Sequence, residues 1–172
     1  MLADRVTTER LVLRRPEPGD VPALQAIFTD HRVDEAAWPA DLRTADDARR
    51  ITERAIAHWE RFRFGPWTAE ERATGRIIGR GGVNHTTVGG RPEVEIGYFI
   101  SADHWGQGYA TELAREAVRV AFEVLELDDV VLFTTPANAG SQAVIRKLGA
   151  EFEREVEHAG LPHVLFRLRR PA

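Results

Sequence analysis

Cysteine is absent from the sequence of 172 residues, and its absence excludes several kinds of chemistry. Disulfide bonds, thiolate metal sites and a cysteine nucleophile all require a residue that this chain does not have. Disulfide bonds are also rare in the reducing cytoplasm. We therefore expect a cytoplasmic protein with neither a disulfide framework nor a cysteine-based catalytic centre.

Long apolar runs and a surplus of basic residues are also missing. No segment approaches the roughly 18 consecutive apolar residues of a membrane-spanning helix. Acidic residues at 4, 9, 17 and 20 interrupt the N-terminal segment, so we expect no signal peptide. The formal net charge is −4, whereas nucleic-acid binding needs a basic surface. We therefore expect no membrane and no nucleic acid among the partners.

Paired metal-ligand spacings are missing as well. The six histidines stand at 31, 58, 85, 104, 158 and 163. None has a second histidine four residues away with an acidic partner, the spacing of many helical zinc sites. We therefore expect no metal, and we interpret the histidines as surface or loop residues.

The length and composition that remain fit one domain covering residues 1–172. Apolar residues make up 43% and charged residues 29% of the chain, as in ordinary globular proteins with a sizeable core. No repeat, low-complexity segment or linker divides the sequence. Its oligomeric state stays open between a monomer and a homodimer.

Hydrophobic periodicity predicts an α+β fold. A segment with alternating apolar residues at 93–100 precedes a helical pattern that begins near Gly108, and an apolar run at 130–135 follows. This strand–helix–strand unit is long enough for two parallel strands. Asp20 and Thr44 are expected N-caps of two earlier helices. We expect further strands at 11–13, 67–69, 77–83, 152–156 and 164–168, a turn over 84–92, and a short helix at 138–148.

The glycine-containing turn at 106–111 is the most informative segment. A helix that follows a strand presents free N–H groups and the positive end of its dipole at its first turn, which favours a phosphate group. Gly106 and Gly108 carry no side chain that would keep a pyrophosphate away from the main chain. Rossmann turns and P-loops use the same physics, so the turn alone does not identify a ligand.

Several separate motifs resemble one family. The runs Gly97-Tyr98-Phe99-Ile100 and His104-Trp105-Gly106-Gln107-Gly108-Tyr109-Ala110-Thr111-Glu112 resemble the cofactor motif of the GNAT superfamily of acetyl-CoA-dependent N-acetyltransferases. Asn138, Ser141 and Lys147-Leu148-Gly149 resemble the motif that follows it. The opening Thr8-Glu9-Arg10-Leu11-Val12-Leu13-Arg14 resembles the branch that contains the ribosomal-protein N-terminal acetyltransferases. The resemblance covers nearly the whole chain.

The resemblance implies a fold and a co-substrate. The fold would be a twisted, mostly antiparallel sheet of six to seven strands with a splayed parallel pair at its centre and about four flanking helices. Acetyl-CoA would place its pantetheine arm in the splayed gap, near the main chain of Phe99 and Ile100. Its pyrophosphate would lie on the main-chain N–H groups of Gly106, Gln107, Gly108, Tyr109, Ala110 and Thr111. Trp105 stands where the family often has Gln or Arg, so we expect no side-chain contact with phosphate from this position.

The resemblance also implies that an amine attacks the thioester directly. The amine must lose a proton first, and Glu95, or Glu93 on the same strand face, is our candidate base acting through water. The plain alternative is that both are solvated carboxylates. Asn138 and Ser141 are either simple N-caps or a cofactor contact and a hydrogen-bond donor to the departing thiolate. Trp38 is either a core residue or part of the acceptor pocket.

Two other functions remain open at this point. The glycines open a helix after a strand, as in a nucleotide-binding oxidoreductase, but the third glycine of that motif is absent. An acyl-CoA-binding module without catalysis would share every cofactor contact. The acceptor is expected to be a small-molecule amine or a peptide or protein N-terminus, and the sequence does not distinguish between them.

Overall fold

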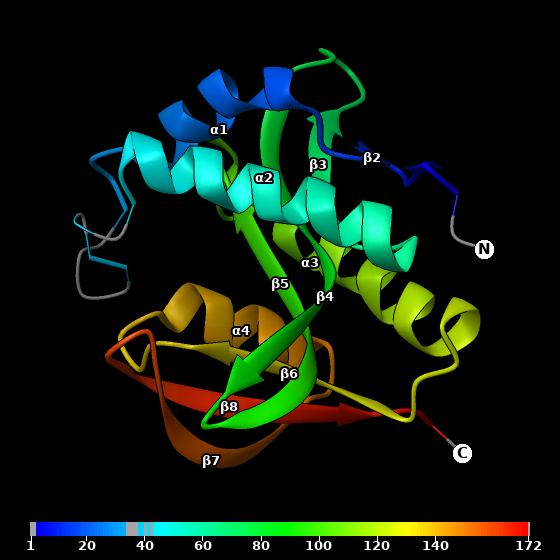
Figure 1. Cartoon of the computed structure of the whole chain (residues 1–172), viewed down its shortest axis with the longest axis vertical. Coiled ribbons are helices and arrows are strands. Elements are labelled where there is room, and N and C mark those ends of the chain that lie inside the picture. The colour runs from blue at the N-terminus through cyan, green and yellow to red at the C-terminus, as the bar shows by residue number, and fades with distance from the viewer. Residues whose placement is uncertain (1–2, 34–37, 40, 42, 172) are drawn as a thin grey trace.

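The computed structural model describes residues 3–33, 38–39, 41 and 43–171. In this part of the chain eight strands form one sheet, and four α-helices pack against it (Figure 1). The strands are β1 (Arg5–Thr7), β2 (Leu11–Arg14), β3 (Pro66–Glu71), β4 (Ile77–Val88), β5 (Arg91–Ile100), β6 (Asp129–Thr134), β7 (Glu151–His158) and β8 (Leu161–Arg169). The helices are α1 (Val21–Phe28), α2 (Ala45–Phe62), α3 (Tyr109–Arg119), which a π-helical turn at Val120–Val124 extends, and α4 (Ala139–Lys147). Short 3-10 turns lie at Pro18–Asp20 and Ala102–His104.

The sheet confirms the expected mixed α+β fold. Its strand order is β1-β2-β3-β4-β5-β6-β8-β7, and every neighbouring pair is antiparallel except β5 and β6. The strand that the sequence did not predict is β1, which pairs Arg5 with Arg14. With three residues it is too short to show a period of two.

The expected turn over 84–92 is wrong in extent. β4 continues to Val88 and β5 begins at Arg91, so only Gly89 and Gly90 form the turn. Their φ angles are +57° and +74°, the left-handed values that a tight two-residue hairpin requires at both central positions. The polar stretch before the turn is a strand because the β-branched Thr86 and Thr87 fit a pleated surface, whatever their polarity.

The glycines of β4 show why this strand lacks side chains where it meets β5. A Cβ atom added at Gly79 would lie 2.2 Å from the Phe99 carbonyl oxygen. One added at Gly81 would lie 2.6 Å from the Gly97 carbonyl oxygen and 2.7 Å from Leu113 of α3. The glycines allow this close approach of the two backbones, and the register with β3 also shifts beside Gly79, because Ala69 pairs with Gly79 and Glu70 with Ile77. α3 can therefore lie directly on the strands that carry the candidate site.

The helices cover both faces of the N-terminal part of the sheet. In Figure 1, α1 and α2 lie in front of β3, β4 and β5, and α3 crosses behind them. The apolar stripe of α3, including Leu113, Ala114 and Ala117, is fully buried against the sheet. On the other face, Phe28 and Leu24 of α1 form a smaller cluster with Ala48 of α2. None of the helices in the described residues is both long and apolar enough to cross a bilayer.

One of the two expected helix caps is confirmed. The Asp47 N–H donates to Thr44 Oγ1 (3.2 Å), so Thr44 caps α2. Asp20 occupies the N-cap position of α1, but its side chain makes no capping bond. Its carboxylate instead accepts hydrogen bonds from Arg14 (2.7 and 3.0 Å), Thr68 Oγ1 (2.6 Å) and the Glu17 N–H (2.9 Å). The partly buried guanidinium of Arg14 needs a counter-charge, and Asp20 supplies it.

Candidate active site

The parallel strands β5 and β6 separate soon after they meet. Their ladder holds a single residue pair, Glu95 with Val131. Beyond it, β5 stays paired with β4 up to Ile100, and β6 stays paired with β8 up to Thr134. The inner edges of both strands therefore diverge, as the splayed parallel pair of the sequence analysis requires. Main-chain groups along such an open edge can pair with an extended ligand.

The glycine turn stands at the end of β5, where α3 begins. Gly106 and Gly108 have φ angles of +72° and +86°, and both are exposed. No side chain caps the helix at Gly108, and its first main-chain bond runs from the Glu112 N–H to the Gly108 carbonyl (3.0 Å). Within the described residues the N–H groups of Tyr109, Ala110 and Thr111 thus have no protein acceptor. They are therefore free to bind an anion at the helix start, which is where the motif predicts one.

A clamp from the N-terminal segment holds this turn in place. Both Thr8 Oγ1 (2.6 Å) and the Arg10 N–H (2.7 Å) donate to Glu112, and Arg10 Nε donates to its second oxygen (2.7 Å). Arg10 also donates to the Gln107 carbonyl (2.7 Å) and lies over the ring of Tyr109 at 4.4 Å. In the sequence these residues stand out only as parts of motifs. Their contact joins positions about 100 residues apart, which no local pattern reveals.

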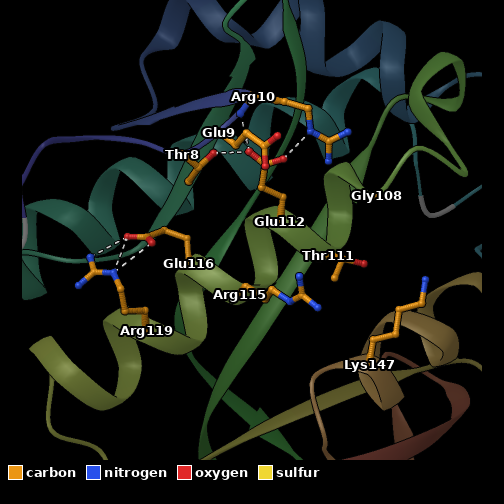
Figure 2. A pocket seen from close by; sticks show the side chains of 10 residues that line it. All are labelled: Thr8, Glu9, Arg10, Gly108, Thr111, Glu112, Arg115, Glu116, Arg119 and Lys147. Atoms are coloured by element: carbon orange, nitrogen blue, oxygen red, sulfur yellow. Dashed lines mark hydrogen bonds and ion pairs between the residues drawn. The ribbon is translucent and has the colours of Figure 1, made fainter.

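A cavity of about 650 Å³ opens beside the turn. Figure 2 shows that the residues around it come from the N-terminal segment, α3 and the end of α4. Arg10 and Arg119 are paired with Glu112 and Glu116. Arg115 and Lys147 point toward the cavity, and neither forms an ion pair with the described residues (Figure 2). Its lining residues are Thr8, Glu9, Arg10, Gly108, Thr111, Glu112, Arg115, Glu116, Arg119 and Lys147.

Trp105 fixes the connection between β5 and the turn. Its indole N–H donates to the Ile100 carbonyl (2.8 Å), and about half of its side chain is exposed. A carbonyl oxygen has two lone pairs, so Ile100 can still accept a second hydrogen bond. Trp105 thus holds the loop in place through its hydrogen bond to Ile100. This agrees with the expectation that its side chain does not contact phosphate.

Glu95 lies on the face of β5 that looks away from α3. Asn84 of the paired strand donates a hydrogen bond to Glu95 Oε1 (3.2 Å). Burial raises the pKa of the Glu95 carboxyl, and the Asn84 hydrogen bond and the charge of Arg80 oppose this rise without cancelling it. The carboxyl lies deep in the protein, while the residue as a whole keeps part of its surface exposed. A carboxylate in such a place can exchange protons through a water molecule.

Glu93 has a different environment from Glu95. It forms an ion pair with Arg167 through both of its oxygens (2.9 and 3.1 Å), and both side chains are largely buried. Arg167 also binds Asp129 and Glu153. The lone pairs of Glu93 are therefore engaged in a network that joins β5 to β6, β7 and β8. This network makes Glu95 the better candidate base.

Asn138 and Ser141 begin α4, close to the divergent end of β6. Asn138 Oδ1 accepts the Ser141 N–H (3.0 Å), so Asn138 is the N-cap. The hydroxyl of Tyr98 lies 3.2 Å from both Ser141 Oγ and the Ser141 carbonyl oxygen. Burial raises the pKa of Tyr98 to about 12, so its phenol keeps its proton. The sequence pattern did not predict a role for Tyr98 in the site, although the place of Tyr98 in the apolar alternation of β5 marked it as inward-facing.

Trp38 lies against Phe99, the β5 residue expected near the pantetheine arm. The ring centroids are 5.0 Å apart, and Phe28 of α1 contacts both rings edge-on at 5.1 and 5.3 Å. Arg43 donates to the Trp38 carbonyl (2.8 Å) and helps to hold this segment. The structure thus brings Trp38 to the wall of the candidate site.

The sheet does not support the oxidoreductase reading. A doubly wound nucleotide-binding sheet needs several consecutive parallel strands. Only β5 and β6 run parallel in the sheet that the structure describes. The open strand pair and the helix start fit another class of ligand, an extended molecule with a phosphate group at one end.

Comparisons with known proteins agree with this geometry. The family described as acetyltransferase (GNAT) domain matches residues 10–151. An uncharacterized N-acetyltransferase, YoaA of Bacillus subtilis, is 28% identical over 148 residues, which are 86% of this chain and 82% of YoaA. A putative ribosomal N-acetyltransferase, YdaF of the same organism, is 26% identical over 144 residues, covering 82% of this chain and 78% of YdaF.

Solved structures show the same fold. An acetyltransferase from Agrobacterium tumefaciens has a TM-score of 0.81 with 26% identity. The match covers 99% of this chain and 96% of the Agrobacterium chain. RimL, a ribosomal L7/L12 alpha-N-protein acetyltransferase solved in complex with coenzyme A, has a TM-score of 0.74 with 16% identity. The match covers 95% of this chain and 96% of the RimL chain. The match over residues 10–151 shows that the chain is an acetyltransferase that belongs to the GNAT family.

Proposed function

We propose that this protein transfers the acetyl group of acetyl-CoA to the nitrogen of a primary amine, which attacks the thioester directly. The observation that carries the proposal is the opening of β5 from β6 beside a helix start with three N–H groups that lack acceptors in the described residues. An open strand edge and an anion-binding helix start at its end match the two parts of coenzyme A, the amide-containing arm and the pyrophosphate.

The phosphates would be held mainly by main-chain atoms. The N–H groups from Gly106 to Thr111 lie at the start of α3, its positive end, where a pyrophosphate would gain from both hydrogen bonds and the helix dipole. Arg115 and Lys147 add two cations that are not neutralised by the described residues. Hydrogen bonds between ionised partners are about twice as strong as neutral ones.

The pantetheine arm would lie between the divergent strands. Its amide groups need partners when they leave water, and the main chain near Phe99 and Ile100 supplies donors and acceptors along the open edge of β5. This placement brings the thioester toward Glu95 on one side and toward the start of α4 on the other. Asn138 holds that start of α4 in position.

Glu95 would remove the proton from the amine through a water molecule. An amine that is protonated at neutral pH has no lone pair for attack, so a nearby proton acceptor is needed. The raised pKa of Glu95 makes it a stronger base than an ordinary surface carboxylate. Glu93 keeps a structural part in this proposal because Arg167 occupies both of its oxygens.

Ser141 would donate a hydrogen bond to the departing thiolate. As the new carbon–nitrogen bond forms, the carbon–sulfur bond breaks and sulfur takes the negative charge and then a proton. A serine hydroxyl is a weak acid, so its contribution is to stabilise this charge. Tyr98, 3.2 Å from Ser141 Oγ, can orient the serine hydroxyl.

Acetyl-CoA-dependent thiol release with a panel of amines tests the proposal. The panel contains free amino acids, polyamines, aminoglycosides and peptides that end in a free α-amine. We expect release with at least one acceptor, and we expect Glu95→Gln but not Glu60→Gln to reduce it. Glu60 is an exposed residue of α2 and serves as the matched control.

The alternative function, an acyl-CoA-binding module without catalysis, predicts a different result. Calorimetry would then show acetyl-CoA binding while the whole panel gave no thiol release above the uncatalysed rate. That combination would overturn the catalytic proposal and keep the binding site. Absence of acetyl-CoA binding would overturn both.

A further inference from the structure

Arg80 of β4 lies on the same sheet face as the candidate base. The ladder between β4 and β5 pairs Arg80 with Phe99 and Asn84 with Glu95. Residues paired across antiparallel strands point to the same face, and residues four apart on one strand do so too. The four side chains therefore form one surface beside the point where β5 leaves β6. It is also the face on which Phe99 meets Trp38.

The guanidinium of Arg80 has no direct partner in the described residues. It lies deep in the protein with only part of its surface open to water, yet no hydrogen bond or ion pair of its side chain is present. Burial lowers the pKa of Arg80 to about 10, against the opposing effect of Glu95, so the group is still charged at neutral pH. Arginines at such depth are normally paired, as Arg14 and Arg167 are in this protein.

The Arg80 guanidinium and the Glu95 carboxyl thus share one surface without forming an ion pair. Their charges interact, but the two groups do not contact each other. Closing the pair would have satisfied both groups, and no described residue takes the place of either partner, so the open arrangement suits a partner from outside the described residues. A molecule with an ammonium group at one end and an anion at the other would complete both contacts at once.

We propose that Arg80 binds a carboxylate of the acceptor, so that the substrate is a free amino acid and not a simple amine or a protein N-terminus. This inference rests on the proposed function, because it assigns the amine end of the same molecule to Glu95. A guanidinium binds a carboxylate through two parallel hydrogen bonds, which fixes the direction of the substrate. A peptide N-terminus offers a neutral carbonyl at this place and leaves the charge of Arg80 unpaired.

The rings next to Arg80 indicate the kind of amino acid. Phe99 stands opposite Arg80 in the ladder and packs edge-on against Trp38 and Phe28. Of these, Trp38 and Phe99 keep some exposed surface. An apolar side chain of the substrate would lie on this aromatic wall. We therefore assign the acceptor to the amino acids with apolar side chains.

Matched substrates test this inference. Thiol release is measured with each apolar amino acid, its carboxamide and its decarboxylated amine, for example phenylalanine, phenylalaninamide and phenethylamine. We expect kcat/KM for at least one amino acid to exceed that for its amide by about tenfold or more, since a site built for a charged group rejects the analogue that lacks it. Arg80→Gln should bring this ratio close to one.

Two variants serve as controls. Arg80→Lys keeps the positive charge but lacks the planar guanidinium that donates two parallel hydrogen bonds. It should retain part of the preference for the carboxylate. Arg76→Gln removes an exposed arginine just before β4 and should leave the ratio unchanged. Circular dichroism and acetyl-CoA affinity check that each variant is folded and keeps its co-substrate site.

The possible results separate the two proposals. Amides, simple amines or peptides acetylated as well as amino acids would overturn the role of Arg80 and leave the transferase proposal intact. If nothing in the panel is acetylated, calorimetry tests whether Arg80 binds a carboxylate. The ligands are N-acetyl amino acids and their amides in the presence of coenzyme A. A carboxylate preference of about tenfold that Arg80→Gln removes would support the site, whereas equal binding or no binding would overturn it.

Discussion

At the scale of single residues, two carboxylates on one face of β5 have different surroundings and therefore different chemistry. Glu93 is engaged by Arg167 through both oxygens, whereas Glu95 accepts one hydrogen bond from Asn84. Spacing alone could not separate them, because they are two residues apart on one strand face. Their partners, one on β4 and one on β8, come from the sheet topology.

Replacing Glu95 tests its role as the base. We expect Glu95→Gln to lower kcat/KM by about 10²-fold or more, the usual size of a general-base contribution. Because burial raises the pKa of Glu95, wild-type kcat/KM should fall as the pH drops through this raised value, where the carboxylate takes up a proton. The variant should lose this acid limb. A variant within about threefold of wild type across the pH range would remove Glu95 from the mechanism.

Replacing Ser141 tests the stabilisation of the leaving group. We expect Ser141→Ala to lower kcat by about tenfold or more while acetyl-CoA affinity stays close to wild type, because the hydrogen bond forms only as charge develops on sulfur. Steady-state kinetics and calorimetry measure the two quantities. Tyr98→Phe should change kcat in the same direction through the 3.2 Å contact of the two hydroxyls. A large loss of affinity with a normal kcat would instead make Ser141 a binding residue.

At the scale of elements, the unit that matters is the end of β5 with the start of α3. The glycine turn, the period of two before it and the helical period after it were readable from the sequence, and the structure confirms this unit as strand, turn and helix. The contacts that hold this unit in place could not be predicted from the sequence. The clamp of Thr8 and Arg10 on Glu112 comes from the other end of the chain.

Gly108→Ala tests whether the turn binds the phosphates. Gly108 has a φ of +86°, and a Cβ there would lie 3.3 Å from Arg10. We expect a loss of about 1–2 kcal/mol in stability from the left-handed conformation, together with a loss of acetyl-CoA affinity of about tenfold, since the helix start must shift. Urea unfolding and calorimetry measure the two effects.

Gly75→Ala is the matched control for this experiment. Gly75 has a φ of +69° in the turn between β3 and β4, where an added Cβ meets nothing within 4 Å. It should lose a similar stability and keep its acetyl-CoA affinity. Equal affinities for the two variants would show that the turn at 106–111 does not contact the phosphates.

At the scale of the whole molecule, the sequence predicted the fold class, the splayed parallel pair and the position of the glycine turn. The sequence did not predict β1, because three residues are too few to show the alternation of a strand. The predicted end of β4 was too early, because the polar residues at 84–87 are typical of a turn. The sequence also did not indicate Tyr98 and Arg80 as candidate site residues. Their importance depends on which strand or helix lies opposite, and pairing between distant segments leaves no mark in a local pattern.

The pH dependence of stability should separate residues that hold the fold from residues kept for function. Burial acts to raise the pKa of Asp20, but hydrogen bonds from Arg14, Thr68 and the Glu17 N–H outweigh it and lower the pKa. Stability from a lowered pKa is present at neutral pH and is lost as the pH falls through the folded-state value. We expect Asp20→Asn to cost about 3 kcal/mol at pH 7, because it leaves the Arg14 guanidinium with one partner fewer. Urea unfolding should show this cost shrinking in acid, and a cost that is independent of pH would contradict the assignment.

Glu95 should behave in the opposite way. Its pKa is raised, so the folded protein holds a proton more tightly than the unfolded chain does, and stability falls as the pH rises through the folded-state value. At a pH above the folded-state pKa the charged Glu95 therefore destabilises the fold, and we expect Glu95→Gln to raise the urea midpoint there, with the gain disappearing as the pH falls below the unfolded-state value. The same substitution should abolish most of the activity. A stability gain together with a loss of activity would support the proposal that Glu95 and Arg80, which has no direct partner among the described residues, are retained for a substrate. A Glu95→Gln variant that is less stable than wild type above the folded-state pKa would mark Glu95 as a structural residue.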